Sequence, residues 1–329
     1  IKYSTSKFTF SFGGMINMKL GILGTADIAF RRFLPALSKC PQITYAGVAS
    51  RTPEKGLKFQ ENFGGKVYES YDALLADESI DAVYVPLPPA LHFEWGKKVL
   101  NAGKHLFMEK PFTTKQSDTK QLLELADQKG LKVHENYMFL YHSQLAKIKE
   151  MIADGSLGDI RLYKMSFGFP MRGQGDFRYN KELGGGALLD CGGYPVRLAL
   201  ELLGNTAKVV HSKLVQPNGF EVDLYGSAVM ENDVGEVAQI SFGMDNAYQC
   251  QLEVWGSKAT LIAPRIFTAG DGIKPTLILR TSFDESKMEL DADDQFLHSI
   301  EEFVWNTTTI AIQSQASLVS NIQNGVIYK

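Results

Sequence analysis

The stretch GILGTADIA at residues 21–29 decides the fold, because it links a short apolar run to a segment of helical period that continues to Leu37. After a first strand, such a turn brings backbone N–H groups and a helix N-terminus against a pyrophosphate. Read as G-x-G-x-x-G, the motif has two of its three glycines replaced by alanine. It predicts a dinucleotide site, and a plain strand–helix turn without nucleotide is the alternative. The predicted phosphate contacts are Gly24, Thr25, Ala26, Asp27 and Ile28.

The segments that follow repeat this alternation of short β-branched runs with helical periods up to about Tyr137, which is typical of a parallel sheet covered by helices. The predicted strands are 20–23, 43–49, 66–68, 82–85, 105–108 and 132–134. Beyond Ile160 longer alternating strands indicate an open, mostly antiparallel sheet. These strands are 161–169, 207–216, 222–231, 236–242 and 249–255, with helices at 143–153, 187–203 and 294–305.

The pattern therefore predicts an α/β protein with two domains, in agreement with a length of 329 residues. Residues 18–137 are expected to form a Rossmann dinucleotide-binding domain. Residues 138–329 are expected to form an α+β domain, with an open sheet, for substrate binding and oligomerisation. Residues 1–17 read as a disordered leader before a start at Met15 or Met18.

Composition excludes several classes of function. The net charge is -3 with acids and bases interspersed, so nucleic acid is not an expected partner. No run approaches the about 18 apolar residues needed to cross a bilayer. Three distant cysteines, Cys40, Cys191 and Cys250, fit free thiols in a reducing compartment such as the cytoplasm. The histidine spacing predicts no metal site.

The end of the second strand selects the cofactor. An NAD enzyme usually carries Asp or Glu there to bind the ribose hydroxyls, whereas this chain has Ser50 and Arg51, with Lys55 a turn later. A guanidinium binds a 2′-phosphate bidentately, so NADP(H) is favoured over NAD. A solvated arginine at a strand end is the alternative.

Two further motifs carry a family resemblance. The fifth strand ends in Glu109-Lys110-Pro111, and residues 184–195 read GGGALLDCGGYP. Together they resemble the Gfo/Idh/MocA oxidoreductases, over Lys19 to about Phe303. The segments ADIAFRR (26–32), VYVPLP (83–88), ENYMF (135–139) and GDFRY (175–179) are similar to the dTDP-3-keto-6-deoxyhexose 3-ketoreductases within that family. The likeness weakens at residues 306–313.

The resemblance implies site residues. Lys110 is the expected catalytic or substrate-orienting lysine, and Tyr194 the expected acid/base, with its pKa lowered by a nearby cation. Asp190 is expected to hold the lysine or the substrate hydroxyls. Pro195 leaves it open whether the helix starts only at Tyr194 or is kinked there. Further expected cofactor contacts are Pro86, Leu87, Pro88, His92, Glu109, Lys110, Asn136 and Arg178; for His92 a satisfied surface histidine is the alternative.

The leading interpretation is NADPH-dependent reduction of the C3 keto group of a dTDP-linked 6-deoxy sugar. One alternative is an NADP-dependent dehydrogenase of a free sugar or trans-dihydrodiol. An alternative of another class is a nonenzymatic NADP-binding sensor or scaffold. A homodimer or homotetramer through the open sheet is plausible, because the open face must be covered.

Overall fold

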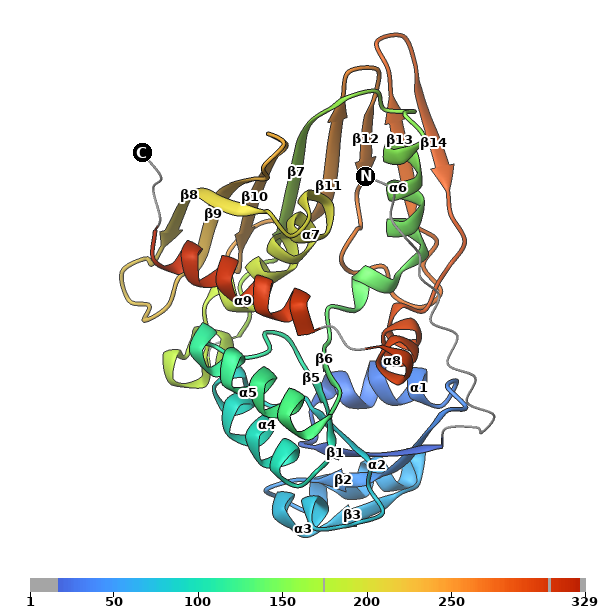
Figure 1. Cartoon of the computed structure of the whole chain (residues 1–329), viewed down its shortest axis with the longest axis vertical. Helices are drawn as coiled ribbons and strands as arrows, with labels where there is room; N and C mark the ends of the chain where they lie inside the picture. The colour runs from blue at the N-terminus through green and yellow to red at the C-terminus, as the bar shows by residue number, and fades with distance from the viewer. Residues whose placement is uncertain (1–16, 174, 307–308, 326–329) are drawn as a thin grey trace.

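The computed structural model describes residues 17–173, 175–306 and 309–325, which form two sheets with helices between and around them (Figure 1). The N-terminal sheet has six parallel strands in the order β3-β2-β1-β4-β5-β6. In this order the strands are added outward on one side from β1 and on the other side from β4, so the strand order reverses between β1 and β4, where open α/β sheets bind ligands. The strands are β1 (Met18–Leu23), β2 (Ile43–Ala49), β3 (Lys66–Tyr68), β4 (Ala82–Val85), β5 (His105–Met108) and β6 (Val133–Glu135).

Helices cover this sheet because its central strands are buried on both faces, as the fully buried β4 shows. Gly130, in the left-handed conformation, ends the longest of these helices. The first connection starts with a π-helical segment, Ala29–Phe33, that continues into α1 (Leu34–Leu37). The others are α2 (Glu54–Phe63), α3 (Tyr71–Leu75), α4 (His92–Asn101) and α5 (Gln116–Lys129).

The second sheet has eight strands in the order β14-β13-β12-β11-β7-β10-β9-β8, and only the β7–β10 pair is parallel. Its middle strands alternate buried and exposed residues, so one face is apolar and the other faces outward. The strands are β7 (Ile160–Gly168), β8 (Lys208–Val215), β9 (Tyr225–Glu231), β10 (Val237–Gly243), β11 (Gln249–Gly256), β12 (Thr260–Ala263), β13 (Thr276–Arg280) and β14 (Glu285–Glu289).

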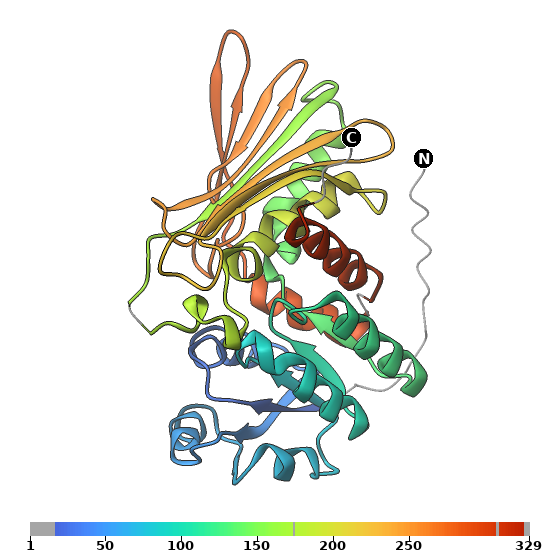
Figure 2. The ribbon, with the colours of Figure 1, turned by 90° about the vertical axis from the view of Figure 1, so that its left-hand side faces the viewer.

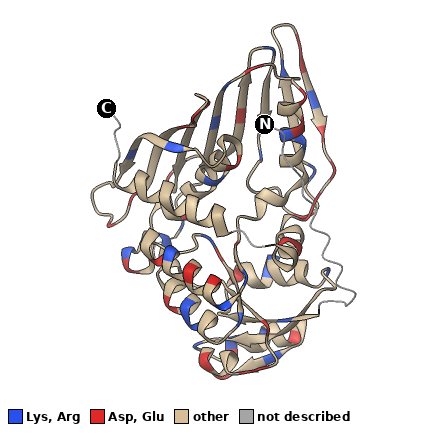
Figure 3. Ribbon diagram, viewed as in Figure 1, with Lys and Arg blue, Asp and Glu red and all other residues tan. Residues whose placement is uncertain are grey.

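The helices of this half lie on one side of the sheet, as the turned view shows (Figure 2). They are α6 (Ser143–Ala153), α7 (Gly193–Leu203), α8 (Gln295–Trp305) and α9 (Thr309–Gln323). The last two also contact the first half: α8 packs against α1, and α9 packs against α5. Charged residues of both signs are interspersed over both halves (Figure 3).

The predicted fold class is confirmed: a parallel Rossmann sheet is followed by a mostly antiparallel one. The six predicted Rossmann strands agree within two residues at each end. The sequence reading missed β12 to β14 and helix α9, which occupies much of the segment where the resemblance weakened. Most of the predicted leader lies outside the described residues; its last residue, Asn17, accepts a hydrogen bond from Thr44.

The helix predicted at 187–203 is continuous, so it does not start only at Tyr194. Pro195 is accommodated by a π-helical segment, Leu188–Gly192, immediately before α7. Such π turns absorb an irregularity in the hydrogen-bond ladder, and Pro35 in α1 likewise follows a π segment. No described helix is long and apolar enough to cross a membrane.

Candidate active site

The loop after β5 and the irregular helix before α7 bring Lys110 and Asp190 together. The Lys110 ammonium lies 2.9 Å from the Asp190 carboxylate and 2.8 Å from the Asp190 carbonyl oxygen. Both side chains are largely buried, so this ion pair is poorly screened by solvent. Lys110 and Asp190, which are 80 positions apart in the sequence, are thus in contact. The sequence analysis expected Asp190 to hold the lysine or the substrate hydroxyls.

Arg178 binds the other oxygen of the same carboxylate. Its Nε donates to Asp190 at 2.8 Å, and its Nη1 donates to Asp176. Burial alone would raise the pKa of Asp190, but the charges and hydrogen bonds of Lys110 and Arg178 lower it. Asp190 therefore stays ionised and holds two cations. The Arg178 guanidinium thus contacts two carboxylates and fixes the Asp190 side chain, while the cofactor contact predicted for this arginine stays a prediction.

Tyr194 projects from the first turn of α7 toward the lysine. The Lys110 ammonium lies 5.2 Å from the centre of the Tyr194 ring. The ring is buried and packs edge-on against Tyr137 and Phe167. Among the described residues no protein group hydrogen-bonds its hydroxyl, which leaves that group for a ligand.

The expected lowering of the Tyr194 pKa is wrong. Burial raises the pKa of this phenol well above its usual value of 10, and the carboxylates of Glu109 and Asp190 raise it further, against the opposing charge of Arg178. The main reason is burial, which the sequence alone does not reveal. Tyr194 is therefore a neutral phenol in this structure.

Glu109 lies beside the lysine but is directed into the protein. Its carboxylate accepts from Tyr84 at 2.7 Å and from Asn136 at 2.6 Å, and Asn136 in turn accepts from Ser299 on α8. Burial raises the pKa of Glu109, opposed by these hydrogen bonds and by Lys110. Glu109 and Asn136, both predicted to contact the cofactor, thus form a network behind Lys110.

The predicted cofactor end lies at the carboxyl edge of β1, β2 and β4. Gly24 has a φ of 101°, and a Cβ there would lie 2.8 Å from the Leu87 side chain, so glycine is required for this close approach. Ser50 is buried, with its Oγ 3.4 Å from that of Thr25. Arg51, Lys55 and Asp27 are exposed, Thr25, Ala26, Ile28, Leu87 and Pro88 are partly exposed, and Pro86 is buried.

These residues fit NADP(H). The helical segment that follows the glycine turn presents its first N–H groups beside that turn, as a pyrophosphate requires. The exposed Arg51 can reach a 2′-phosphate, and no acidic side chain ends β2. The sequence analysis overlooked Tyr71, whose hydroxyl would lie 3.8 Å from a Cβ at Gly24. Burial raises the pKa of Tyr71, and the nearby Arg51 cation opposes this effect. Tyr71 therefore lies beside both the glycine turn and Arg51.

His92 is fully buried, which excludes the surface histidine considered from the sequence. Its ring nitrogens lie 2.8 Å from the Pro111 carbonyl and 2.7 Å from the Leu87 carbonyl. Burial lowers its pKa, against these hydrogen bonds. A neutral ring donates to one of these two carbonyls, so His92 lies between the loop after β4 and the turn after Lys110 and is hydrogen-bonded to one of them. Its predicted cofactor contact stays a prediction.

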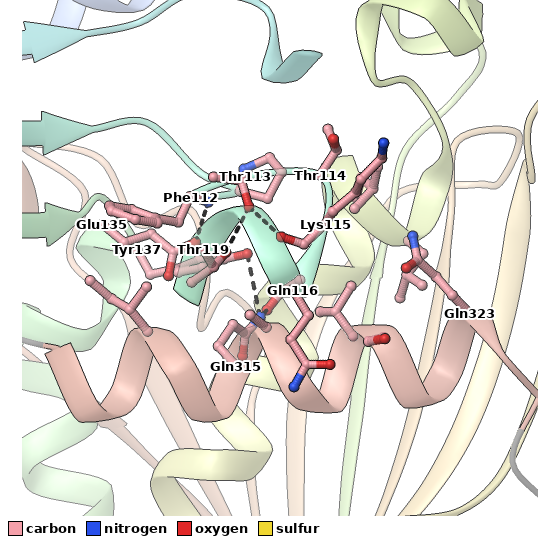
Figure 4. Close-up of a pocket in the computed structure, with 18 residues that line it drawn as sticks. Phe112, Thr113, Thr114, Lys115, Gln116, Thr119, Glu135, Tyr137, Gln315 and Gln323 are labelled. Carbon is pink, nitrogen blue, oxygen red and sulfur yellow. Dashed lines mark hydrogen bonds between the residues drawn. The ribbon is translucent and has the colours of Figure 1, made fainter. Parts of the chain in front are cut away.

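A small pocket lies behind this turn, between α5, β6 and α9 (Figure 4). Its floor includes Glu135, whose carboxylate accepts from the Phe112 N–H at 2.7 Å, and Gln315, which donates to the Gly193 carbonyl. The pocket is a narrow space between these packed side chains, too small for a dinucleotide. The residues that line the pocket therefore pack behind the turn that follows Lys110. They lie on the opposite side of that turn from Tyr194 and the glycine turn.

Comparison with known proteins identifies the family. A model described as "Oxidoreductase family, NAD-binding Rossmann fold" matches residues 18–137, and the Gfo/Idh/MocA C-terminal domain matches residues 145–262. The chain belongs to the Gfo/Idh/MocA oxidoreductase family. Within it, the dTDP-3,4-didehydro-2,6-dideoxy-α-D-glucose 3-reductase of Actinomadura kijaniata is 38% identical over 94% of this chain and 95% of its own. An NADP⁺-dependent D-xylose 1-dehydrogenase of Haloferax volcanii is 30% identical over 87% of this chain and 88% of its own.

A solved structure agrees with the fold along nearly the whole chain. The 3-ketoreductase of Actinomadura kijaniata, in complex with NADP and TDP-benzene, has a TM-score of 0.91 and 38% identity, covering 94% of this chain and 98% of its own. Variants of that ketoreductase with a substituted lysine or tyrosine have also been solved. The two positions are separated by the same number of residues as Lys110 and Tyr194.

Proposed function

We propose that this protein is an NADPH-dependent reductase of the C3 keto group of a dTDP-linked 3-keto-6-deoxy sugar. The observation that carries the proposal is the Lys110 ammonium held by Asp190 over the ring of a neutral Tyr194. The similarity to 3-ketoreductases along nearly the whole chain supports the substrate class. Their names make dTDP-3,4-didehydro-2,6-dideoxy-α-D-glucose the first substrate to test.

The reaction needs a hydride at the carbonyl carbon and a proton at its oxygen. When bound, NADPH supplies the hydride from C4 of its nicotinamide. Lys110 donates a hydrogen bond to the oxygen as negative charge develops there. Tyr194 gives its phenolic proton to that oxygen, and the new C–H and O–H bonds complete the alcohol. The Lys110 ammonium then faces the phenolate, which regains a proton from solvent.

Gly24, Ser50 and Arg51 are the residues we assign to the cofactor, together with the N–H groups of residues 25–28. Gly24 allows the close turn, and Arg51 pairs with the 2′-phosphate. The 18–137 and 138–329 division remains our proposal for the domains. Thr25, Lys55, Leu87 and Pro88 lie along the same edge of the sheet and are at least partly exposed. We assign them further contacts to the cofactor.

The substrate test is NADPH consumption with enzymatically generated dTDP-3,4-didehydro-2,6-dideoxy-α-D-glucose. We expect turnover with a nucleotide-linked 3-keto sugar and loss of it in Lys110→Met. A panel of free pentoses, hexoses and trans-dihydrodiols with NADP⁺ is run in parallel. Turnover of the free sugars alone would reject the substrate proposed here.

The second candidate is the reverse reaction, an NADP-dependent dehydrogenase of a free sugar. The similarity to D-xylose 1-dehydrogenase favours it. Tyr194 can serve either direction, as the acid in reduction and as the base in oxidation, so the choice rests on the relatives. The higher identity and longer coverage shared with the 3-reductase favour reduction.

For assembly and location we propose a homodimer or homotetramer through the outer face of the second sheet, in the cytoplasm. The outer face exposes Trp255, and all three cysteines are buried free thiols. Free thiols persist in reducing compartments.

A further inference from the structure

The inner face of the second sheet ends in two aromatic rings that are open to solvent. Along β11 and β7 the residues that face the helices are buried, as Cys250 and Phe167 show. The next positions in the same two rows are Tyr248 and Phe169, and the register of the β7–β11 pair places them opposite each other. Tyr248 is 49% exposed, and Phe169 is partly exposed. The apolar face that is covered elsewhere is therefore open at this end.

This open end lies beside the candidate proton donor. The Phe167 ring centre is 4.9 Å from that of Tyr194 and 6.2 Å from that of Phe169, so these three rings are contiguous. On the other side the Phe267 ring is 5.9 Å from Tyr194, and the next residue places its hydroxyl 2.6 Å from that of Tyr248. Each of the two open rings is thus about one side chain away from the phenol.

An exposed arginine flanks each open ring. The Nε of Arg265 donates to the Thr268 carbonyl at 3.2 Å, which holds its guanidinium next to the residue that contacts Tyr248. The guanidinium of Arg172 lies 5.1 Å from the centre of the Phe169 ring. No carboxylate in the described part of the chain forms an ion pair with either arginine. Two cations without a counter-charge therefore stand at this end of the sheet.

The covalent structure of a nucleotide-linked sugar matches this arrangement. Only C2, C1 and the glycosidic oxygen separate the C3 carbon from the β-phosphorus. When the C3 oxygen is at Tyr194, the diphosphate lies about one side chain further out. A guanidinium binds a phosphate with two parallel hydrogen bonds, and a nucleobase stacks on an exposed aromatic ring. Both kinds of group are present at the open end of the face.

We propose that Arg172 and Arg265 bind the diphosphate of the substrate and that Tyr248 gives its base a stacking surface. These three residues and Phe169 are the nucleotide subsite. The proposal deepens the function proposed above and rests on the position that Tyr194 has in it. A free sugar would leave the subsite empty, so the subsite is what makes the enzyme select a nucleotide-linked sugar.

The test measures binding of two probes to the protein saturated with NADP⁺: dTDP by calorimetry and thymidine by ligand-detected NMR. We expect the parent protein to prefer dTDP. Arg172→Ala and Arg265→Ala should each weaken dTDP binding about 10- to 100-fold and leave thymidine binding within about threefold, because only dTDP carries the phosphates. The control is Arg280→Ala, an exposed arginine of β13 paired with Glu285, which should leave both affinities within about twofold.

Substitutions of Tyr248 test the stacking surface separately. Tyr248→Leu should weaken dTDP and thymidine by a similar factor of about 5- to 100-fold, because the base is common to both. Tyr248→Phe keeps the ring and should keep both affinities within about threefold. Loss of affinity in Tyr248→Phe equal to that in Tyr248→Leu would contradict the stacking role.

The double variant Arg172→Ala/Arg265→Ala decides the proposal. Unchanged dTDP affinity, or equal weakening of dTDP and thymidine, would overturn it, as would a parent protein without preference for dTDP. Reduction of the dTDP-linked 3-keto sugar with an unchanged KM in the double variant would reject the subsite alone. Loss of the dTDP preference in that variant, in a protein that fails to reduce the sugar, would reject the proposed function alone.

Discussion

At the residue scale, the site depends on where charge is placed around a phenol. Asp190 is shared by Lys110 and Arg178, and Glu109 is held by Tyr84 and Asn136. The cations are thereby neutralised, and burial keeps Tyr194 protonated. The neutral phenol is the form that can give a proton to the carbonyl oxygen in reduction.

Tyr194→Phe tests this role. We expect kcat for reduction to fall by about 10² to 10⁴, because the proton donor is lost while the packing of the ring is kept. In the parent protein the neutral phenol is the active form and its pKa lies well above 10, so kcat should not decline through Tyr194 ionisation between pH 6 and 9. Initial rates with saturating substrates check both. A decline near pH 7 that disappears in Tyr194→Phe would contradict the assignment.

Arg51→Ala tests cofactor choice. Loss of a charge-assisted contact to the 2′-phosphate should raise the KM for NADPH on the order of 10- to 100-fold and leave that for NADH nearly unchanged. Steady-state kinetics with both cofactors measure the ratio. Arg161→Ala, an exposed arginine of β7, is the control. Equal effects on the two cofactors would show that Arg51 does not contact the phosphate.

At the scale of elements, local pattern explains the Rossmann strands better than the rest. Buried β-branched runs identify β1 to β6 because such strands are apolar on both faces. Strand β14 is exposed throughout, and serine and glutamine interrupt the apolar residues of α9, so neither shows the clear apolar period used for prediction. Tyr84, Ser299 and Gln315 were not predicted as site residues because no local pattern marks them. They reach the site only after their elements pack.

The pocket between α5, β6 and α9 yields a prediction on stability. Burial raises the pKa of Glu135 to about 7, opposed by Arg197. The folded protein therefore keeps this proton to higher pH than the unfolded chain, and stability is lost as pH rises from about 4.5 through 7. Glu135→Gln should reduce that loss by on the order of 3 kcal/mol, since glutamine can still accept from Phe112.

Urea unfolding at several pH values measures this effect. The control is Glu61→Gln, at an exposed position of α2. If Glu135→Gln and the parent protein lose stability equally between pH 5 and 8, then Glu135 is already ionised in the folded protein.

At the scale of the whole molecule, the second sheet presents one face outward. Lys164 and Glu253 pair on it at 3.5 Å, and the Lys164 ammonium lies 4.8 Å from the Trp255 ring centre. The edge strand β14 carries charges, which discourages edge-to-edge pairing. Face-to-face association is therefore the expected mode.

Light scattering after size exclusion tests this association. We expect the parent protein to be a dimer or tetramer and Trp255→Glu to weaken it at least about tenfold, because a charge replaces an interface aromatic. Phe283→Glu, at the exposed tip of the β13–β14 hairpin, should leave the assembly unchanged. A monomeric parent, or equal effects of the two substitutions, would exclude this face.

The sequence by itself determined the fold class and, through the motifs shared with the family, predicted Lys110, Asp190 and Tyr194 as site residues, because short motifs and periodicity are local properties of the chain. Only the tertiary structure decided the protonation of Tyr194, the burial of His92 and the second contact between Asp190 and Lys110. Those depend on desolvation and on groups from distant elements, whose combined field and hydrogen bonds exist only once the chain is packed.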